Sequence, residues 1–551
     1  MITTTPPSFE QYATNVMELR YSHTVRRRVE NWIDIASRVV NSIMPNVTPI
    51  VPSDTVSAIF EIIRDRKFIP AGRTLSQAGR AYHQTDNCFC VWAEDTREGW
   101  ADLLHKCTMM FMSGGGVGVD YSQLRPYGAP LQRSGGFASG PIPLIHAVNS
   151  VGAAVRQGGE RRGAIYASLV WDHEDIQQFI QMKNGNNCLE HTNISVRFNK
   201  GWQKCYPHVQ GNLNVNDTFL DTLQHACQWG DPGFQFDNDN QILRNACTEI
   251  ISADDSDSCC LGSVNLANIK NLQELSDVVQ LGTLFLLCNT MYTHTPTDKV
   301  AKVKRQNRRL GLGLMGVAEW FVQRSQPYGF IAFDLLENLS MAHSANNSDH
   351  FASWLYTYKV ASDRAADIWS GKLNVNRPIA VRAIAPTGTI SIVGGHTTPG
   401  IEPIFCQAYQ RTYNTLKEQT HSNGYKKEIV IDPIVQKMIE QGYNVEDIDT
   451  AYSLSKSIAG IERRIAFQAF CQRYVDNAIS STVNLPQYVQ GIEDKILPVL
   501  LKYLPQLRGI TFYPDGRYNN QPVVQVDITD ALKKQGVMEQ HESCKGGECG
   551  I

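Results

Sequence analysis

Helical runs alternate with short strand-like segments along this chain, and this alternation limits its fold more than any other feature. From residue 281 onward, amphipathic runs are separated by short segments such as 381–395 (VRAIAPTGTISIVGG). Upstream, residues 164–171 and 192–198 read as strands, whereas 141–157 reads as an amphipathic helix that ends at a Gly-Gly pair. Alternating elements of this kind favour an α/β architecture.

The composition excludes several classes of protein. The 551 residues include 51 Lys+Arg and 54 Asp+Glu, a net charge of −3, which provides no electrostatic basis for direct, non-specific binding of nucleic acid. No stretch approaches about 18 uninterrupted apolar residues, and the first residues lack the apolar core of a signal peptide, so we expect a cytoplasmic protein without a membrane segment. Helices are expected over residues 24–43 and 55–66, and residues 533–551 read as a mobile polar tail.

The cluster Asn245-Ala-Cys247-Thr-Glu249 is the most informative candidate for chemistry. In an extended segment, side chains at i, i+2 and i+4 share one face. Asn245, Cys247 and Glu249 would then present an amide, a redox-capable sulfur and a carboxylate together, and the carboxylate could serve as a general base. The alternative interpretation is a buried cysteine between two solvated polar residues.

The chain has 14 cysteines, and without a secretory signal we expect a reducing compartment, where cysteine pairs are more often catalytic or metal-binding than structural. Cys88 and one of the adjacent residues Cys259 and Cys260 could form a dithiol that supplies two electrons. Their spacing fits structural zinc poorly, and buried unpaired cysteines are the alternative. Cys544 and Cys549 flank Gly-Gly in the polar tail, which could exchange disulfides with an external reductant; a zinc half-site is the alternative there.

Two turns rich in glycine could lie beside phosphate. Residues 114–119 (GGGVGV) lack the strand–GxGxxG–helix context of a dinucleotide loop, so they give little support to a Rossmann fold. Residues 385–391 (APTGTIS) combine backbone N–H groups with hydroxyls that can cradle phosphate, but they contain no lysine and are not a P-loop. An ordinary turn is the alternative for the second segment.

Together these segments resemble the catalytic large subunit of ribonucleotide reductases. The resemblance covers residues 68–551 and follows the family's order through PAGRTLSQAG, NCFC, GGGVGVDYSQLRPYGAP, VRQGGERRGAIYASL, NACTE, CCLGSVNLANI, RRLGLGLMGVAEWF, APTGTISIVGG with GIEPIF, and YVDNAISSTVNLP. It implies a ten-stranded α/β barrel of two five-stranded parallel halves, with a central finger loop that carries a radical cysteine. Residues 1–66 would be a short helical region without an N-terminal ATP cone, 67–526 the catalytic barrel, and 527–551 a flexible redox-active tail.

The resemblance also implies how the candidate residues act on a ribonucleotide. Cys247 would carry the thiyl radical that removes the 3′-hydrogen. Glu249 would be the base for the 3′-hydroxyl, and Asn245 would hydrogen-bond near the 2′/3′ edge of the ribose. The residues expected to contact the substrate are Thr74, Asn87, Gly115, Gly116, Thr387, Gly388, Thr389 and Ser391.

A second set of residues would supply the electrons. The resemblance implies that Cys88 and Cys259 reduce the substrate and become a disulfide, with Cys260 as an alternative partner of Cys88. Cys544 and Cys549 match the tail pair that re-reduces the active site. The external reductant would be a dithiol protein of the thioredoxin or glutaredoxin type.

Allosteric control of substrate specificity is implied as well. Asp95 and Arg125 match positions that contact a deoxynucleotide or ATP effector. Residues 141–157 match a helix that pairs across a homodimer, here through an apolar stripe that includes Val148; packing of this stripe on the chain's own barrel is the alternative. Residues 183–191 match the loop that relays effector identity to the substrate. We therefore expect effector nucleotide to shift the chain from monomer to dimer.

The branches of this family differ in the source of the radical, and this chain resembles two of them. One branch of the family binds adenosylcobalamin, whereas another uses a separate ferritin-like dimetal subunit and adjacent tyrosines in the large subunit. Tyr513 has Phe512 and Pro514 as neighbours, which favours adenosylcobalamin, although Tyr513 stays a candidate radical relay. The sequence ends directly after Cys-x4-Cys, as in the two-subunit branch. We expect a separate dimetal subunit and no metal in this chain, with adenosylcobalamin as the alternative.

Two other classes of function fit less well. A nucleotide-binding module with a decayed reductase fold would have lost part of the catalytic set, yet every member is present. A zinc-stabilised nucleic-acid-binding protein conflicts with the near-neutral charge and the ligand spacing. The sequence leaves open whether the substrate is a ribonucleoside diphosphate or triphosphate, and which reductant is used.

Overall fold

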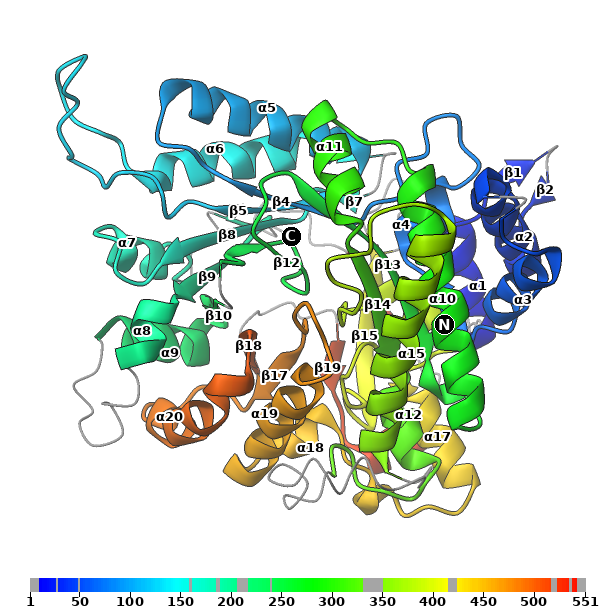
Figure 1. Cartoon of the computed structure of the whole chain (residues 1–551). Coiled ribbons are helices and arrows are strands. Elements are labelled where there is room, and N and C mark those ends of the chain that lie inside the picture. The colour runs from blue at the N-terminus through cyan, green and yellow to red at the C-terminus, as the bar shows by residue number, and fades with distance from the viewer. Residues whose placement is uncertain are drawn as a thin grey trace.

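The computed structural model describes residues 9–25, 28–47, 50–157, 161–184, 189–205, 217–237, 240–330, 350–414, 424–516, 523–534 and 538–542. The N-terminal region packs on one flank of the molecule, drawn dark blue in Figure 1. Its elements are the helices α1 (Phe9–Arg20), α2 (Trp32–Ile43) and α3 (Ser53–Arg64), and a small hairpin of β1 (Thr24–Val25) and β2 (Arg28–Val29).

The helix predicted over residues 24–43 begins only at Trp32. Asn31 caps this helix, because its side chain accepts a hydrogen bond from the backbone N–H of Asp34 while the Asp34 carboxylate accepts one from the backbone N–H of Asn31. Such a reciprocal cap satisfies two donors at the start of a helix. The second helix, predicted over 55–66, is present as α3.

Five parallel strands form the first half of the main sheet. In spatial order they are β4 (Cys88–Trp92), β5 (Gly116–Asp120), β8 (Ile165–Val170), β9 (Thr192–Phe198) and β10 (Gly233–Phe236). Nearly all their residues are buried, as in parallel strands covered on both faces. Helices on the outside of this half are α5 (Arg97–Ser113), α6 (Pro141–Ala154), α7 (Ile176–Gln181), α8 (Lys200–Cys205) and α9 (Asp217–Trp229).

The second half is also parallel and closes the sheet into a barrel. Its strands are β13 (Asp257–Asn265), β14 (Leu310–Met315), β17 (Thr482–Leu485) and β18 (Gly509–Pro514). Parallel bridges from Leu312 to Arg382 and from Ile384 to Ile479 insert one further segment between β14 and β17. Antiparallel pairing joins the halves at β13–β4 and β10–β18. The predicted barrel of two five-stranded parallel halves is therefore confirmed.

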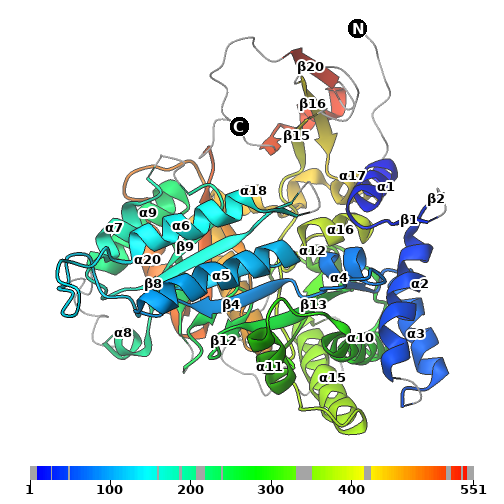
Figure 2. The same ribbon diagram turned by 90° about the horizontal axis from the view of Figure 1, so that it is seen from above.

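Further elements surround this barrel. The strand β3 (Phe68–Pro70) pairs with β13 beside β4, and the short helix α4 (Gly72–Gln77) follows it. The second half carries, as seen in Figures 1 and 2, α10 (Leu272–Tyr292), α11 (Asp298–Asn307), α12 (Val317–Val322), α15 (Phe351–Lys372), α16 (Gly388–Val393), α18 (Ala451–Ser455), α19 (Ile458–Gln472) and α20 (Ile492–Tyr503). No helix among the described residues is both long enough and apolar enough to cross a bilayer.

The helix predicted over 141–157 is shorter and is oriented differently from the prediction. It ends at Ala154, because Arg156–Gln157 pairs as β6 with β7 (Arg161–Arg162). Leu144 and Val148 of the predicted stripe are fully buried in the core of their own chain. These two residues of the stripe therefore pack on the barrel, as in the alternative interpretation, whereas Val151 and Val155 are half-buried.

A separate small sheet combines two strands between residues 408 and 431 with two strands near the end of the chain. It contains β19 (Val523–Gln525), β15 (Ala408–Asn414), β16 (Gly424–Ile431) and β20 (Met538–Glu542), with α17 (Pro433–Glu440) and α21 (Ile528–Lys534) beside it. Figure 2 shows this sheet projecting from the barrel. Part of the predicted tail thus has regular structure, whereas Cys544 and Cys549 lie outside the described residues.

Candidate active site

A cavity of about 270 Å³ brings together segments that are far apart in the sequence. It is lined from β4, from the start of β5, from the loop at residues 245–250, and from α16. Predicted site residues on its wall are Asn87, Cys88, Gly115, Gly116, Cys247, Glu249, Thr387, Gly388 and Thr389. Among the described residues, no three His, Cys, Asp or Glu side chains are grouped as metal ligands would be.

The loop that carries Cys247 is a tight turn between two short antiparallel strands, β11 (Leu243–Arg244) and β12 (Ile251–Ser252). Residues 245–249 are not extended, the condition under which a shared face was considered, because the backbone N–H of Thr248 donates to the Asn245 carbonyl and Thr248 has φ +69°. The turn still places the three predicted side chains together. Asn245 Nδ2 donates to Glu249 Oε1 at 2.9 Å, and Asn245 Oδ1 accepts from the N–H of Ile250 at 3.0 Å.

Two glycines of β5 let this finger loop lie against the sheet. A Cβ on Gly118 would lie 1.9 Å from the carbonyl oxygen of Arg244, and one on Gly116 would lie 2.7 Å from Ala246 Cβ and 3.3 Å from Cys88 Sγ. No side chain fits between these backbones. The glycine-rich segment therefore serves close packing of the finger loop on β5.

Gly118→Ala is expected to displace the finger loop, because the atom that blocks the new methyl group is backbone. Overpacking of this kind costs about 1–3 kcal/mol of the free energy of unfolding. Turnover should fall together with the midpoint of thermal unfolding. Gly371→Ala is the matched control, since a Cβ there meets nothing within 4 Å and both quantities should stay unchanged. A fully active Gly118→Ala enzyme would contradict the proposed contact.

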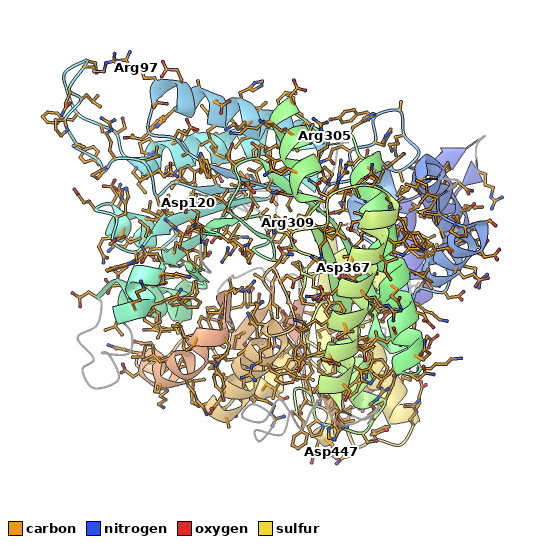
Figure 3. The ribbon with its side chains drawn as sticks, in the orientation of Figure 1. Arg97, Asp120, Arg305, Arg309, Asp367 and Asp447 are labelled. Carbon is orange, nitrogen blue, oxygen red and sulfur yellow. The ribbon has the colours of Figure 1, made fainter. Side chains whose placement is uncertain are left out.

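Buried charge holds the base of the finger loop. Arg309 Nε donates to Asp257 Oδ2 at 2.7 Å, and Ser252 Oγ on β12 donates to the same oxygen at 2.7 Å. Arg244 Nη2 donates to the Phe236 carbonyl at 3.0 Å. Figure 3 shows Arg309 near the centre of the molecule, beside the finger loop. Because breaking a buried ion pair costs about 3–5 kcal/mol, these contacts keep the loop in place.

The strand register resolves which thiols face one another. Cys259 lies directly opposite Cys88 in the antiparallel pair of β13 and β4, and neither forms a disulfide. Opposite Cβ atoms in such pairs are about 4.5–5.5 Å apart, a distance that small movements can convert to disulfide geometry. Cys260 points to the other side of β13, where its Sγ donates to Asp86 Oδ1 at 3.2 Å and accepts from Lys304 Nζ at 3.5 Å.

Two oxygen atoms at the cavity have no hydrogen-bond partner among the described residues. They are Oε2 of Glu249 and Oδ1 of Asn87, and both side chains line the cavity. Burial of the carboxyl group, with a smaller contribution from the nearby Cys88, raises the pKa of Glu249 to about 8. An unpartnered buried acceptor costs about 1–3 kcal/mol, so a ligand with hydroxyl donors would be favoured here.

Not every predicted residue reaches the cavity. Thr74 is buried on α4 and accepts from Asn289 Nδ2 at 3.2 Å, and Ser391 Oγ donates to the Gly388 carbonyl at 3.1 Å. Both lie behind the wall. Residues that the sequence reasoning missed on the wall include Gly72 and Ser263. Their only signal was their place within the PAGRT and CCLGS segments.

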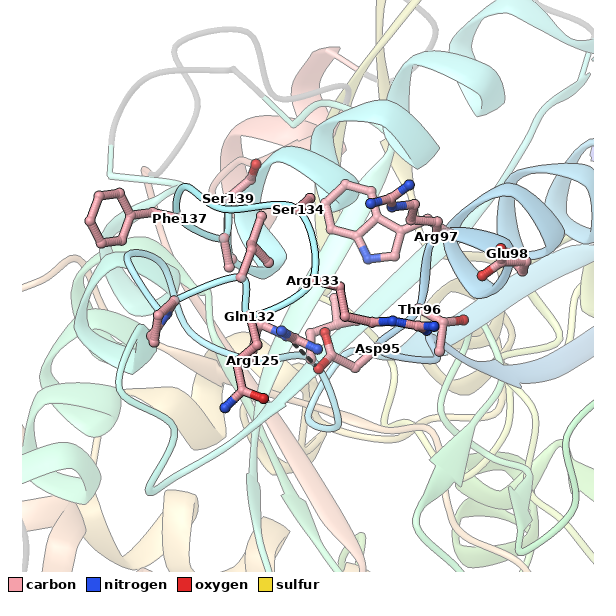
Figure 4. Close-up of a pocket in the computed structure, with 16 residues that line it drawn as sticks. Asp95, Thr96, Arg97, Glu98, Arg125, Gln132, Arg133, Ser134, Phe137 and Ser139 are labelled. Carbon is pink, nitrogen blue, oxygen red and sulfur yellow. Dashed lines mark hydrogen bonds and ion pairs between the residues drawn. The ribbon is translucent and has the colours of Figure 1, made fainter.

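A second, larger cavity of about 1090 Å³ contains the predicted effector residues. Asp95 Oδ2 accepts from Arg125 Nε at 2.7 Å, as Figure 4 shows. The N-terminal end of α5 and the loop over residues 130–140 complete the wall and add the cations Arg97 and Arg133. Of the predicted relay loop 183–191, residues 185–188 lie outside the described residues.

Tyr513 lies on β18, the strand that joins the two halves of the barrel. It shares a strand face with Thr511, since alternate residues point the same way. Thr511 and the finger-loop residue Thr248 line one small internal cavity. Tyr513 is half-buried, whereas its neighbour Phe512 is part of the core.

Comparison with known proteins places this site in a family. The family described as "Ribonucleotide reductase, barrel domain" matches residues 86–230, 212–342 and 372–497. A vitamin B12-dependent ribonucleoside-diphosphate reductase of Mycobacterium tuberculosis is 27% identical over 534 residues, which cover 89% of this chain and 74% of that protein. A protein with the same name from Thermoplasma acidophilum is 28% identical, over 83% of this chain and 64% of its own length. An adenosylcobalamin-dependent ribonucleoside-triphosphate reductase of Lactobacillus acidophilus is 24% identical, over 83% and 70%.

These names correct one expectation from the sequence. A separate ferritin-like dimetal subunit was expected as the radical source, yet the similar proteins are named for dependence on vitamin B12 or adenosylcobalamin. The expectation was wrong because it relied on where the sequence stops after Cys-x4-Cys, whereas the missing tyrosine pair pointed to the other branch. The matched segments span most of the barrel, including Cys88, the finger loop and the turn at Thr387. The chain therefore belongs to the ribonucleotide reductase family.

Proposed function

We propose that this chain reduces ribonucleotides to 2′-deoxyribonucleotides through a thiyl radical at Cys247, with adenosylcobalamin as the radical source. One observation carries the proposal: Cys247, Cys88 and Glu249 line a single cavity. A radical sulfur, a reducing thiol and a base within one cavity are the groups that this reduction needs. Zinc binding and a decayed active site have no comparable support.

The accessibility of the thiols fits a radical source that approaches from outside. Cys247 is half-exposed on the cavity wall, whereas Cys88 and Cys259 are buried. Adenosylcobalamin, when bound, would supply the one-electron oxidation that converts the Cys247 thiol into a thiyl radical. Cys247 is therefore the most exposed of the three thiols, which suits the first oxidation step, while the buried pair would serve the later two-electron step.

The remaining residues would handle protons and electrons. Glu249 would accept the proton of the substrate 3′-hydroxyl on Oε2, the oxygen without a partner, while Asn245 holds Oε1. Asn87 Oδ1 would accept from a second ribose hydroxyl. The 2′-hydroxyl would leave as water with a proton from one thiol of the pair. Cys88 and Cys259 would then pass the second thiol hydrogen and the electrons to C2′ and become a disulfide, a two-electron reduction of the substrate.

The other end of the cavity would hold the substrate phosphates. Thr387, Gly388 and Thr389 line it, and the hydroxyl and backbone N–H groups of such a turn suit phosphate oxygens. Similar proteins carry names that include both diphosphate and triphosphate reductases. The deciding assay is turnover of the purified chain with adenosylcobalamin, dithiothreitol and either CDP or CTP. Formation of neither deoxynucleotide would overturn the proposal.

The reaction is expected to need high pH because of Glu249. A base acts in its deprotonated form, and burial raises the pKa of this carboxyl to about 8. The value of kcat/KM should therefore rise about tenfold per pH unit below that pKa and level off above it. Glu249→Gln should remove both this ascending limb and most of the activity. A flat profile between about pH 6 and about pH 9 in the unmodified enzyme would contradict the role of Glu249.

Regulation and re-reduction complete the proposal. Asp95 and Arg125 would bind a deoxynucleoside triphosphate or ATP in the larger cavity, and Cys544 and Cys549 would pass electrons from a thioredoxin-type protein.

An effector that binds between two copies of the chain favours the dimer by mass action. Small-angle scattering with and without dATP is expected to show a larger radius of gyration with nucleotide. An unchanged monomer at saturating dATP would reject the effector-induced homodimer.

A further inference from the structure

A tyrosine from the N-terminal region reaches the wall of the catalytic cavity. The hydroxyls of Tyr21 and Thr389 are hydrogen-bonded to one another, although 368 residues separate them in the chain. Thr389 lines the cavity, and α1, which ends just before Tyr21, packs against α16. Figure 2 shows α1 beside α16 at the edge of the barrel. Tyr21 precedes every segment that matches the family's barrel domain.

We infer that Tyr21 is a positioning residue that orients the Thr389 hydroxyl toward the substrate phosphate. This inference rests on the proposed function, because it takes Thr389 as a phosphate contact. It assigns to the N-terminal region a part in substrate binding.

The aromatic ring of Tyr21 is held so that its hydroxyl has one position. Only 5% of the side chain is exposed. The ring lies on Gly72, also on the cavity wall, where an added Cβ would be 3.1 Å from both Cε1 and the hydroxyl oxygen of Tyr21. A Cβ at position 72 would therefore require the ring to shift by a few tenths of an ångström.

A buried ion pair fixes the backbone of Tyr21 to the same wall. Arg38 Nη2 donates to the Tyr21 carbonyl at 3.1 Å and to the Leu75 carbonyl at 3.0 Å, and Arg38 Nη1 donates to the Ala78 carbonyl at 2.7 Å. Glu30 accepts from Arg38 Nε at 2.9 Å and keeps the guanidinium in place. Arg38 thus ties the chain at Tyr21 to α4, the helix that begins at Gly72.

The chemistry of two hydroxyls then determines the direction of the hydrogen bonds. Each hydroxyl has one proton to donate, and a phosphate oxygen can only accept. When Thr389 donates its proton to phosphate, its oxygen remains free to accept from Tyr21, so the phenol donates inward. Hydrogen bonds in such a chain strengthen one another. Without the phenol, the Thr389 hydroxyl is free to rotate away from the substrate.

Tyr21→Phe tests this arrangement, because phenylalanine retains the ring on Gly72 and removes only the hydroxyl. Binding is measured by calorimetry on the cofactor-free chain with CDP and with cytidine. The variant is expected to raise the Kd for CDP about two- to tenfold, the loss of one hydrogen bond, and to leave the Kd for cytidine unchanged. In turnover assays KM should rise with kcat almost unchanged.

Two further variants separate positioning from general weakening. Tyr292→Phe is the matched control, since its hydroxyl accepts from Gly79 N–H just beyond α4 at 3.0 Å, and it should change neither Kd. In a Thr389→Val background, Tyr21→Phe should have no further effect, because the hydroxyl it orients is already gone. Additive effects, equal losses for CDP and cytidine, or unchanged CDP binding in Tyr21→Phe would each overturn the inference.

The outcome also distinguishes this inference from the proposed function. If Thr389→Val bound CDP as tightly as the unmodified chain, Thr389 would not be a phosphate contact and the inference would be overturned. The proposed reduction would still stand if the unmodified chain formed deoxynucleotide.

Discussion

Cys247→Ser is expected to abolish deoxynucleotide formation, with a loss of about 10³-fold or more, the scale seen when a residue central to the chemistry is removed. The serine O–H bond is stronger than the cysteine S–H bond, so no radical forms at this position. The fold should survive, since Cys247 is half-exposed on a turn and serine has nearly the same size. Product formation by chromatography and thermal unfolding measured together check both expectations.

The interpretation of Cys247→Ser depends on the state of the variant protein. An unfolding midpoint equal to that of the unmodified chain, with no product, supports Cys247 as the radical site. Activity above a few per cent in a folded variant would reject that assignment.

Cys88→Ser and Cys259→Ser are each expected to stop the reaction before the ribose is fully reduced, with a loss of similar size. The register of β4 and β13 places these two thiols opposite each other, so each is the expected disulfide partner of the other. The measurement is the number of free thiols after one turnover in the absence of added reductant. The unmodified chain should lose two thiols per active site, and each variant should lose none.

Cys260→Ser provides the matched control, because this residue is adjacent to Cys259 in sequence but points to the other side of the strand. Its thiol donates to Asp86, and a serine hydroxyl can make the same hydrogen bond. Turnover should stay within about threefold of the unmodified chain, the size expected for one altered hydrogen bond, and two thiols should still be lost. If Cys260→Ser retained all its thiols and Cys259→Ser lost two, the pairing would be with Cys260.

Much of the barrel followed from local patterns in the sequence. The strand at 192–198 is found with the predicted bounds, and that predicted over 164–171 is found as β8. Hydrophobic content and flanking turns are local properties, so the sequence carries them directly. The predicted helix boundaries were less accurate than the predicted strands. At Asn31 a side-chain cap sets the start of the helix, and after Ala154 a short hairpin ends the helix.

The sequence predicted which residues form the site, but it did not predict how their side chains are arranged in space. Asn245, Cys247 and Glu249 do lie on one loop, but a turn with positive φ at Thr248, and not an extended segment, brings Asn245 and Glu249 together. Thr74 was predicted on the wall and lies behind it. Local sequence cannot separate a wall residue from its supporting neighbour, because both carry polar side chains within the same motif.

The α/β alternation, the available chemical groups and the family resemblance could all be inferred from the sequence, because each depends on residues that are near one another in the chain. In contrast, the folded core is needed to show that Cys259 faces Cys88 while Cys260 faces Asp86 and Lys304. It is also needed to show that Tyr21 contacts Thr389. The physical reason is that strand register and packing of the N-terminal helices on the barrel are set by the whole core. The contact between Tyr21 and Thr389, which are 368 residues apart, depends on that core, and no local sequence pattern indicates it.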